Sequence, residues 1–269
     1  GTATLGSQAS VTGSGNNNRF SNITLEGDVI LDSNASDRTD YDNITGTGDV
    51  TVTGAGRTIF QTSPALWVGD LTISTTGPGG LQLGTVAGAG DRIPDTSNVT
   101  VSSGAFLRLS TASETVGALS GTGTINTNSP GGGTAVLSIG AGDADGNFSG
   151  LLENAGGVLA LTKVGAGTQT ITGTNTYTGK TAINGGILEV DGVDVFGPIP
   201  GVATADQISF NGGIIKTIGS FDFDIANRGI TTTAPGGGGF NIPLGETVNV
   251  TSPVVGDGSI TKSGEGLMV

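Results

Sequence analysis

Segments that pair a glycine with apolar residues recur along the middle of this chain at nearly regular intervals. The clearest two are Asn184–Leu188, which reads NGGIL, and Asn211–Ile215, which reads NGGII. A sequence period between about 20 and 50 residues is typical of solenoids, in which each repeat forms one turn of a stack. We therefore expect a unit of roughly 26 residues, present about ten times. The glycines that mark the series are Gly80, Gly104, Gly133, Gly157, Gly186, Gly213 and Gly239.

A longer echo supports this period. Ser21–Leu25 (SNITL) returns as Ser97–Val101 (SNVTV), and Gly46–Val50 (GTGDV) returns as Gly121–Ile125 (GTGTI). Gly256–Ile260 (GDGSI) is a third copy of the second motif. The first two motifs return after nearly the same interval, which is close to three of the shorter units.

The residues between the glycines have the character of β-strands. The chain contains 51 Gly, and 35% of its residues are hydrophobic, with many Val, Ile, Leu and Thr. Glycine supplies positive φ angles at tight turns, and β-branched residues favour strands. In residues 221–225 (FDFDI), Phe221, Phe223 and Ile225 would share one face of a strand, opposite two aspartates. No segment shows a clear helical period, and disorder and a collagen helix are both excluded.

These features predict an all-β fold, a parallel β-helix of about ten coils. One coil of two or three short strands cannot bury its own apolar face, whereas stacked coils bury a continuous core. Ten coils spaced by about 4.8 Å would form a rod roughly 50 Å long. We read no firm domain boundary and expect residues 1–269 to form one solenoid segment. Asp191–Ala205 is the best candidate for a loop that leaves the stack.

The segment Leu161–Val190 resembles the autotransporter-associated β-strand repeat, also called the passenger-associated transport repeat. Residues 91–109, 116–125 and 148–150 resemble segments that commonly surround this repeat, and residues 1–90 resemble it more loosely. Ile260–Val269 looks like the first third of another copy, in which Met268 departs from the usual Leu. The resemblance rests on these residues: Leu161-Thr162-Lys163, Gly165-Ala166-Gly167-Thr168, Thr172-Gly173, Asn175-Thr176-Tyr177-Thr178-Gly179, Thr181 and Gly186-Ile187-Leu188.

The resemblance implies a right-handed parallel β-helix within a large secreted protein of a bacterial cell surface, often an autotransporter passenger. It does not imply one ligand or one activity. Within this repeat, Lys163 and Tyr177 are expected to be structural residues rather than parts of a site.

A repeat that begins again in Ile260–Val269 suggests that the chain belongs to something longer. Both ends of a solenoid expose unpaired strand edges, and such edges pair readily with other strands. We therefore expect the partners to be neighbouring coils or copies of the same protein, stacked end to end. A contact of this kind that does not close would propagate into a filament.

Composition excludes several classes of function. Ten basic and 23 acidic residues give a net charge of −13, which disfavours nucleic acid because phosphate binding requires a basic patch. The chain has no His and no Cys, which removes Ser-His-Asp and Cys-His catalysis and the commonest zinc sites. No apolar run reaches membrane-spanning length, so we expect no membrane insertion of this segment. We predict no catalytic residue, no cofactor and no metal site.

Paired carboxylates are candidates for chemistry, because some β-helix proteins cleave polysaccharides. Two carboxylates at a suitable separation could cleave a glycosidic bond, and a lyase would need a basic residue such as Lys216 or Arg228 beside an acidic cluster. We expect these acids to be solvated residues on the outside of the rod. The pairs are Asp222 with Asp224, Asp191 with Asp194, and Asp143 with Asp145.

Asp143–Asn147, which reads DADGN, is similar to the start of a calcium-binding loop. In an EF-hand loop the turn glycine lies at position six and a bidentate Glu at position twelve. Here Gly146 lies at position four, and position twelve is Asn154. The sequence therefore favours a simple turn, and calcium binding by Asp143 and Asp145 stays open.

Two other surfaces are conceivable. A carbohydrate-binding or adhesive surface predicts exposed aromatic rings, and Trp67, Tyr41 and Tyr177 are the only Trp and Tyr residues. An ice-binding surface would need threonine at one position of successive coils, which the variable spacing argues against.

The function favoured by the sequence is structural. We expect a stalk, spacer or filament unit of a secreted bacterial surface protein, located outside the cell or on its outer surface. An adhesin or carbohydrate-binding surface, with surface glycans as partners, is the first alternative, and a polysaccharide-cleaving β-helix enzyme is the second.

Overall fold

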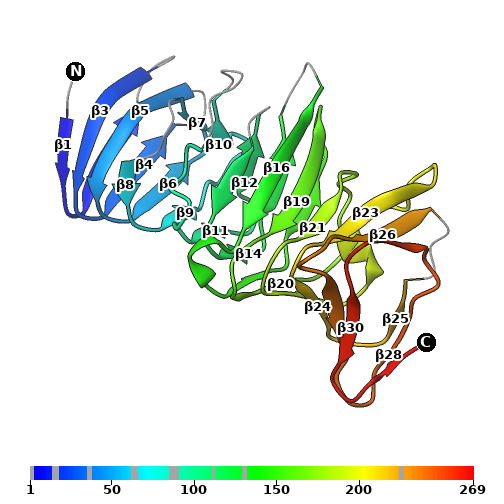
Figure 1. The fold of residues 1–269 in the computed structure, drawn as a ribbon. Coiled ribbons are helices and arrows are strands. Elements are labelled where there is room, and N and C mark those ends of the chain that lie inside the picture. Colours follow the sequence, from blue (N-terminus) through cyan, green and yellow to red (C-terminus); the bar gives the residue numbers. More distant parts are fainter. Residues whose placement is uncertain are drawn as a thin grey trace.

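The computed structural model describes residues 3–13, 18–34, 38–61, 66–84, 91–110, 113–128, 132–223 and 227–269. Throughout this part of the chain the structure is an all-β solenoid with two short 3₁₀ turns, η1 (Ala141–Asp143) and η2 (Val193–Phe196). All the described strand pairs are parallel, and the isolated bridge between Asn128 and Gly156 is antiparallel. Figure 1 shows the coils stacked in chain order, so the two termini lie at opposite ends. The predicted fold class is confirmed.

Among the described residues the structure contains four sheets, numbered 1 to 4. Sheet 2 runs the length of the stack and has 12 strands. Its strands, in spatial and chain order, are β2 (Ala9–Gly13), β4 (Val29–Ser33), β6 (Val50–Gly54), β9 (Leu71–Ile73), β11 (Val99–Val101), β14 (Leu119–Gly121), β17 (Gly146–Phe148), β20 (Thr168–Ile171), β22 (Ile187–Val190), β24 (Ile214–Thr217), β27 (Gly238–Asn241) and β30 (Ile260–Ser263).

Three further sheets complete the other faces. Sheet 1 contains β1 (Ala3–Gly6), β3 (Asn18–Glu26), β5 (Arg38–Thr47), β7 (Arg57–Phe60), β10 (Gly80–Leu83), β12 (Phe106–Leu109), β15 (Thr124–Thr127) and β18 (Leu151–Glu153), with β8 (Leu66–Val68) beside β5. Sheet 3 contains β13 (Glu114–Val116), β16 (Thr134–Ile139), β19 (Val158–Lys163), β21 (Thr181–Ile183), β23 (Thr204–Phe210), β26 (Arg228–Thr232) and β29 (Val254–Gly256). Sheet 4 contains β25 (Phe221–Asp222), β28 (Thr247–Asn249) and β31 (Leu267–Met268).

The coil is shorter and less regular than the sequence period indicated. Eleven steps carry the chain from Ala9 in β2 to Ile260 in β30, which gives about 23 residues per coil. A single step in sheet 2 can be as short as that from Ile171 to Val190 and as long as that from Leu71 to Val99. The predicted count of about ten coils is confirmed, but the predicted repeat unit is a few residues too long.

The spacing of the glycine series overestimates the number of residues per coil, because its members do not all lie at the same sheet. Gly80 and Gly104 lie at or just before strands of sheet 1, and Gly133 and Gly157 directly precede strands of sheet 3. The last three glycines of the series lie just before or inside strands of sheet 2. The two longest spacings, which end at Gly133 and at Gly186, occur where the series passes to another sheet. The longer echo also changes face, because Ser21–Leu25 lies in sheet 1 whereas Ser97–Val101 ends in sheet 2.

The core consists of rows of inward-facing apolar side chains, and each sheet contributes such a row along the stack. In sheet 2, Val52, Ile73 and Val101 pair in register, and all three are fully buried, whereas Thr72 and Thr100 point outward. Burying one such side chain stabilises the fold by about 1.5–3 kcal/mol. Aromatic rings stack along the same axis in two groups, Phe20–Tyr41–Phe60–Trp67 and Phe196–Phe223–Phe240–Phe210.

One corner of the N-terminal half combines glycine with aspartate. Gly48 has a φ of +147°, and a Cβ there would lie 2.1 Å from the carbonyl oxygen of Gly27 in the preceding coil. The next residue, Asp49, donates its backbone N–H to Asp28 Oδ1 at 2.9 Å, and Asp49 Oδ1 accepts from the N–H of Asp70 at 2.8 Å. Each corner carboxylate therefore ties one coil to the next.

Buried polar residues bridge the coils around the segment that resembles the repeat. Gln169 is fully buried, and its side-chain amide accepts from Leu119 N at 3.0 Å and donates to Leu119 O at 2.8 Å, across two coils. A Cβ on Gly146, in the intervening strand, would lie 2.4 Å from Gln169 Oε1, so glycine is required there. Lys163 Nζ donates to the carbonyls of Val164 and Gly165 at 2.5 and 3.2 Å, and burial lowers its pKa.

The predicted loop Asp191–Ala205 contains no strand until β23 begins at Thr204, so its last two residues belong to the stack. It is also anchored, because Val195 and Phe196 of η2 are buried. The buried guanidinium of Arg228 donates to carbonyl oxygens in η2 and just beyond it, and its burial lowers its pKa. These contacts are 3.2 Å to Val193, 3.4 Å to Phe196, 2.6 Å to Gly197 and 3.1 Å to Pro198.

Candidate binding groove

The side-chain carboxylates of Asp143 and Asp145 accept hydrogen bonds from backbone N–H groups of the next coil. Asp143 Oδ1 accepts from the N–H of Ala166 and Asp145 Oδ1 from the N–H of Thr168, both at 2.6 Å. Within the described ranges, no group of three or more His, Cys, Asp or Glu side chains is placed to hold a metal ion. The two aspartates thus have a structural role that needs no calcium.

The remaining predicted acids are engaged separately. Asp191 accepts from the backbone N–H of Gly173 at 3.2 Å through both oxygens, and Asp222 accepts from the side-chain amide of Asn249. At Asp194 it is the backbone carbonyl, not the carboxylate, that accepts from the N–H groups of Asn175 and Gly197, both at 3.1 Å. Asp224 lies outside the described residues, so its pairing with Asp222 stays a prediction.

Neither candidate base lies free beside an acidic cluster. Lys216 forms an ion pair with Glu189, with Nζ 2.6 Å from Oε1, and Glu189 has a lowered pKa because its hydrogen bonds to Lys216 and Thr170 outweigh its partial burial. Arg228 is buried against the carbonyls of the η2 loop. Lys216 is thus engaged in an ion pair with Glu189, and Arg228 in hydrogen bonds to carbonyl groups.

None of the Trp and Tyr residues, all three of which the structure describes, is exposed as the carbohydrate-binding alternative predicted. Trp67, Tyr41 and Tyr177 are 2%, 1% and 0% exposed. The Tyr177 hydroxyl is 2.7 Å from Thr181 Oγ1, and burial raises the pKa of Tyr177 to about 12. Tyr177 and Lys163 are therefore structural residues, as expected.

Threonine does recur at one coil position, contrary to the expectation from the variable spacing. Thr51, Thr72 and Thr100 pair in register on the outer face of sheet 2. Extra residues in the corners change the length of the coil, but they leave these threonines in register. Ser120 continues this row, and Asn147 follows in β17, so the face is a mixed polar surface rather than a uniform threonine array.

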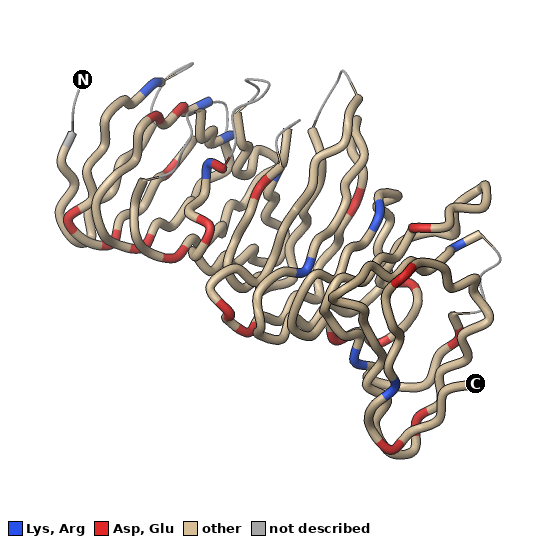
Figure 2. Tube along the Cα trace, in the orientation of Figure 1, with Lys and Arg blue, Asp and Glu red and all other residues tan. Residues whose placement is uncertain are grey.

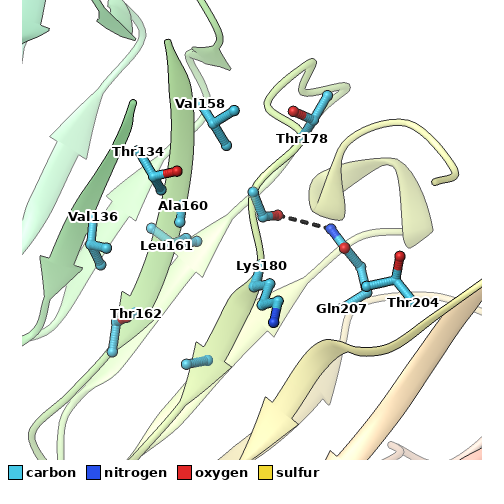
Figure 3. A pocket seen from close by; sticks show the side chains of 12 residues that line it. Thr134, Val136, Val158, Ala160, Leu161, Thr162, Thr178, Lys180, Thr204 and Gln207 are labelled. Atoms are coloured by element: carbon cyan, nitrogen blue, oxygen red, sulfur yellow. Dashed lines mark hydrogen bonds between the residues drawn. The ribbon is translucent and has the colours of Figure 1, made fainter. Parts of the chain in front are cut away.

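A groove of about 500 Å³ lies on the outer face of sheet 3 (Figure 3). It arises because one coil is short. Successive steps along this sheet run from Leu137 to Leu161, from there to Thr181 and on to Ile208, and the middle step is the shortest. The short coil leaves only three residues for β21, between the six-residue β19 and the seven-residue β23.

The floor of the groove is apolar, and its rim is polar. Val136, Val158 and Ala160 provide outward-facing methyl groups on β16 and β19. Gly179 is needed beside them, because a Cβ would lie 2.2 Å from the carbonyl oxygen of Leu159. Polar groups around this floor come from Thr134, Thr162, Thr178, Lys180, Thr204 and Gln207.

The polar rim is partly fixed by hydrogen bonds. Gln207 is only 4% exposed, and its Nε2 donates to the carbonyl of Gly179 at 2.8 Å (Figure 3). Thr178 Oγ1 accepts from Asn154 Nδ2 at 2.7 Å. These bonds fix the side chains of Gln207 and Thr178.

The groove is nearly neutral, although the protein is acidic. Figure 2 shows Asp and Glu distributed along the whole rod, with far fewer Lys and Arg. Among the described residues that line the groove, Lys180 is the one that carries a charge, and its ammonium forms an ion pair with Asp206. No sequence signal marks this site, because it depends on the length of one coil relative to its neighbours.

Similarities to known proteins agree with this fold. The model of the passenger-associated transport repeat matches residues 161–190. The chain is also similar to an adhesin of Brucella suis biovar 1 (strain 1330), the BmaC autotransporter, with 32% identity over 215 residues. That alignment covers 71% of this chain but only 6% of the relative, so the chain spans a small part of that protein's length.

A parallel β-solenoid with such a repeat defines a secreted protein segment of the autotransporter-passenger type. This chain carries a passenger-associated transport repeat, which begins in β19 and ends with β22. The matched segment exceeds one coil, because Leu161 and Thr181 already pair as neighbours in sheet 3. Among the described residues, no helix has the length and apolar character needed to cross a membrane.

Proposed function

We propose that this chain is a stiff spacer segment of a secreted bacterial surface protein, located outside the cell or on its outer surface. The observation that carries the proposal is the 12-stranded parallel sheet, which continues through the stack from β2 to β30. Eleven steps of about 4.8 Å give a length of roughly 50 Å. Each coil packs mainly on its neighbours, so length can be added without changing the cross-section.

The proposed role is not enzymatic. Asp143, Asp145 and Asp191 accept hydrogen bonds from the backbone, and the buried Arg228 holds a loop. These groups are thus committed to structure. The stacking of further coils or copies at either end is part of the proposal, and nucleic acid is not among the proposed partners.

Adhesion is a second candidate function. Two observations favour it: the similar Brucella protein is named an adhesin, and the outer face of sheet 3 carries a preformed groove. A spacer and an adhesive surface are compatible, because the groove uses outward-facing residues that the core does not need.

The spacer role can be tested by deleting this segment from the full-length surface protein. The deletion should lower the height of the protein above the cell by roughly 50 Å, as measured by atomic force microscopy or immunogold labelling. For the isolated chain, small-angle scattering should give an elongated particle. A compact particle, or an unchanged height after deletion, would refute the spacer role.

A further inference from the structure

The groove over β21 has the two-sided chemistry that a sugar ring requires. A pyranose ring has apolar C–H faces and an edge of hydroxyl groups. The groove presents methyl groups of Val136, Val158 and Ala160, with hydroxyls of Thr134 and Thr162 at its border. We infer that this groove is a binding site for a short neutral oligosaccharide, an inference that rests on the proposed surface location and adds a ligand class to it.

The size of the groove agrees with this ligand class. Small-molecule sites usually have volumes of about 300–1,000 Å³, and this groove has about 500 Å³. Such a volume accommodates roughly two or three sugar rings. The groove is also open along one side, since it is the outer face of a sheet, so the ends of a longer glycan can extend into solvent.

Gln207 supplies the best-positioned polar group. Its Nε2 must face Gly179 O, which can only accept a hydrogen bond, and the contact is 2.8 Å. The amide orientation is therefore fixed, and Oε1 is left as an acceptor for a ligand hydroxyl. Because Gln207 is already held in a nearly buried position, little side-chain entropy is lost when a ligand binds.

Charge selects a neutral ligand over an acidic one. The ammonium of Lys180 is already paired with Asp206, so the described lining of the groove holds no uncompensated cation. The net charge of −13 adds a repulsive field for anionic sugars. Since the described lining also has no aromatic ring to stack on the sugar, we expect a dissociation constant on the order of 1 mM.

The experiment is saturation-transfer NMR on the whole chain with lactose, maltose and chitobiose as neutral probes and sialyllactose as the acidic probe. At least one neutral probe should receive saturation. Ala182→Trp, which fills the groove, and Gln207→Leu, which removes the acceptor, should each reduce that transfer at least fivefold. Thr100→Trp, at an outward position on sheet 2, is the matched control and should leave it unchanged.

Three results would overturn the inference: no transfer to any neutral probe, transfer to sialyllactose alone, or transfer that survives Ala182→Trp. Circular dichroism and the melting temperature show whether each variant is folded. If Ala182→Trp fails to fold, Gln207→Leu decides the question. The spacer role is measured separately by particle shape, so a loss of sugar binding with an intact rod rejects the site without rejecting the proposed function.

Discussion

Gln169 connects coils that are two steps apart, and its replacement by leucine tests whether a side-chain amide is needed inside this stack. The native amide accepts from Leu119 N at 3.0 Å and donates to Leu119 O at 2.8 Å, in a fully buried position. Leucine has a similar size but no hydrogen-bonding group. It would leave one buried N–H and one buried C=O without these partners.

The cost can be worked out from those two groups. Each buried backbone group that loses its partner costs about 1–3 kcal/mol, so Gln169→Leu should destabilise the fold by about 2–6 kcal/mol. The third contact of the amide, from Nε2 to Thr170 O at 3.0 Å, moves the expectation towards the upper part of this range. The effect should be local, because stability in a stack is approximately a sum of coil and interface terms.

Hydrogen exchange measured by NMR is the direct assay, since Leu119 N–H should lose most of its protection in Gln169→Leu. Urea denaturation gives the accompanying free-energy change. Gln207→Leu serves as a graded control, because the bond of Gln207 to Gly179 O is a single one of this kind. The reasoning is refuted if Gln169→Leu costs less than Gln207→Leu, or if the exchange rate of Leu119 N–H does not change.

Three further outcomes are expected. Gly48→Ala should destabilise the chain by more than about 1 kcal/mol in urea titration, because its Cβ would meet Gly27 O, whereas Gly192→Ala, with open space around it, should be neutral. Burial raises the pKa of Glu114 from 4.5 to about 8, because it outweighs the hydrogen bonds from the backbone. The contribution of Glu114 to stability is therefore complete below pH 4.5 and is lost as the pH rises through 8. In Glu114→Gln the urea midpoint should fall less over this pH range. Arg228→Met should expose the loop after β22 to limited proteolysis at least tenfold faster, and an unchanged cleavage rate would show that its carbonyl contacts do not anchor the loop.

The fold could be predicted from local sequence patterns, but the number of residues per coil could not. Alternation in Val99–Val101 places Thr100 outside and two valines inside, as the structure shows. The length of a coil is less visible, because the step from Val50 to Leu71 is much shorter than the step from Leu71 to Val99, although both preserve the register. Extra residues are absorbed in the corners, so the distance along the chain between similar motifs does not measure the coil.

The C-terminal echo of the repeat shows why a local motif does not identify a face. Leu161–Lys163 lies in sheet 3, but the similar residues Ile260–Lys262 lie in sheet 2. What the two segments share is the turn that follows. Lys163 Nζ donates to Gly165 O at 3.2 Å, and Lys262 Nζ donates to Gly264 O at 2.7 Å. The motif therefore specifies a lysine-capped turn, and the same turn can be used at different corners.

Variation in coil length also explains how one fold can carry both a spacer and a site. The core needs only inward-facing rows in register, and Leu161, Thr181 and Ile208 keep that register although the two intervening steps differ in length. The shorter step removes half a strand from the outer face of sheet 3 and opens the groove. The longer step supplies the loop that Arg228 anchors. Since sheet 2 keeps its strand pairing through both coils, surface features can vary from coil to coil while the rod stays continuous.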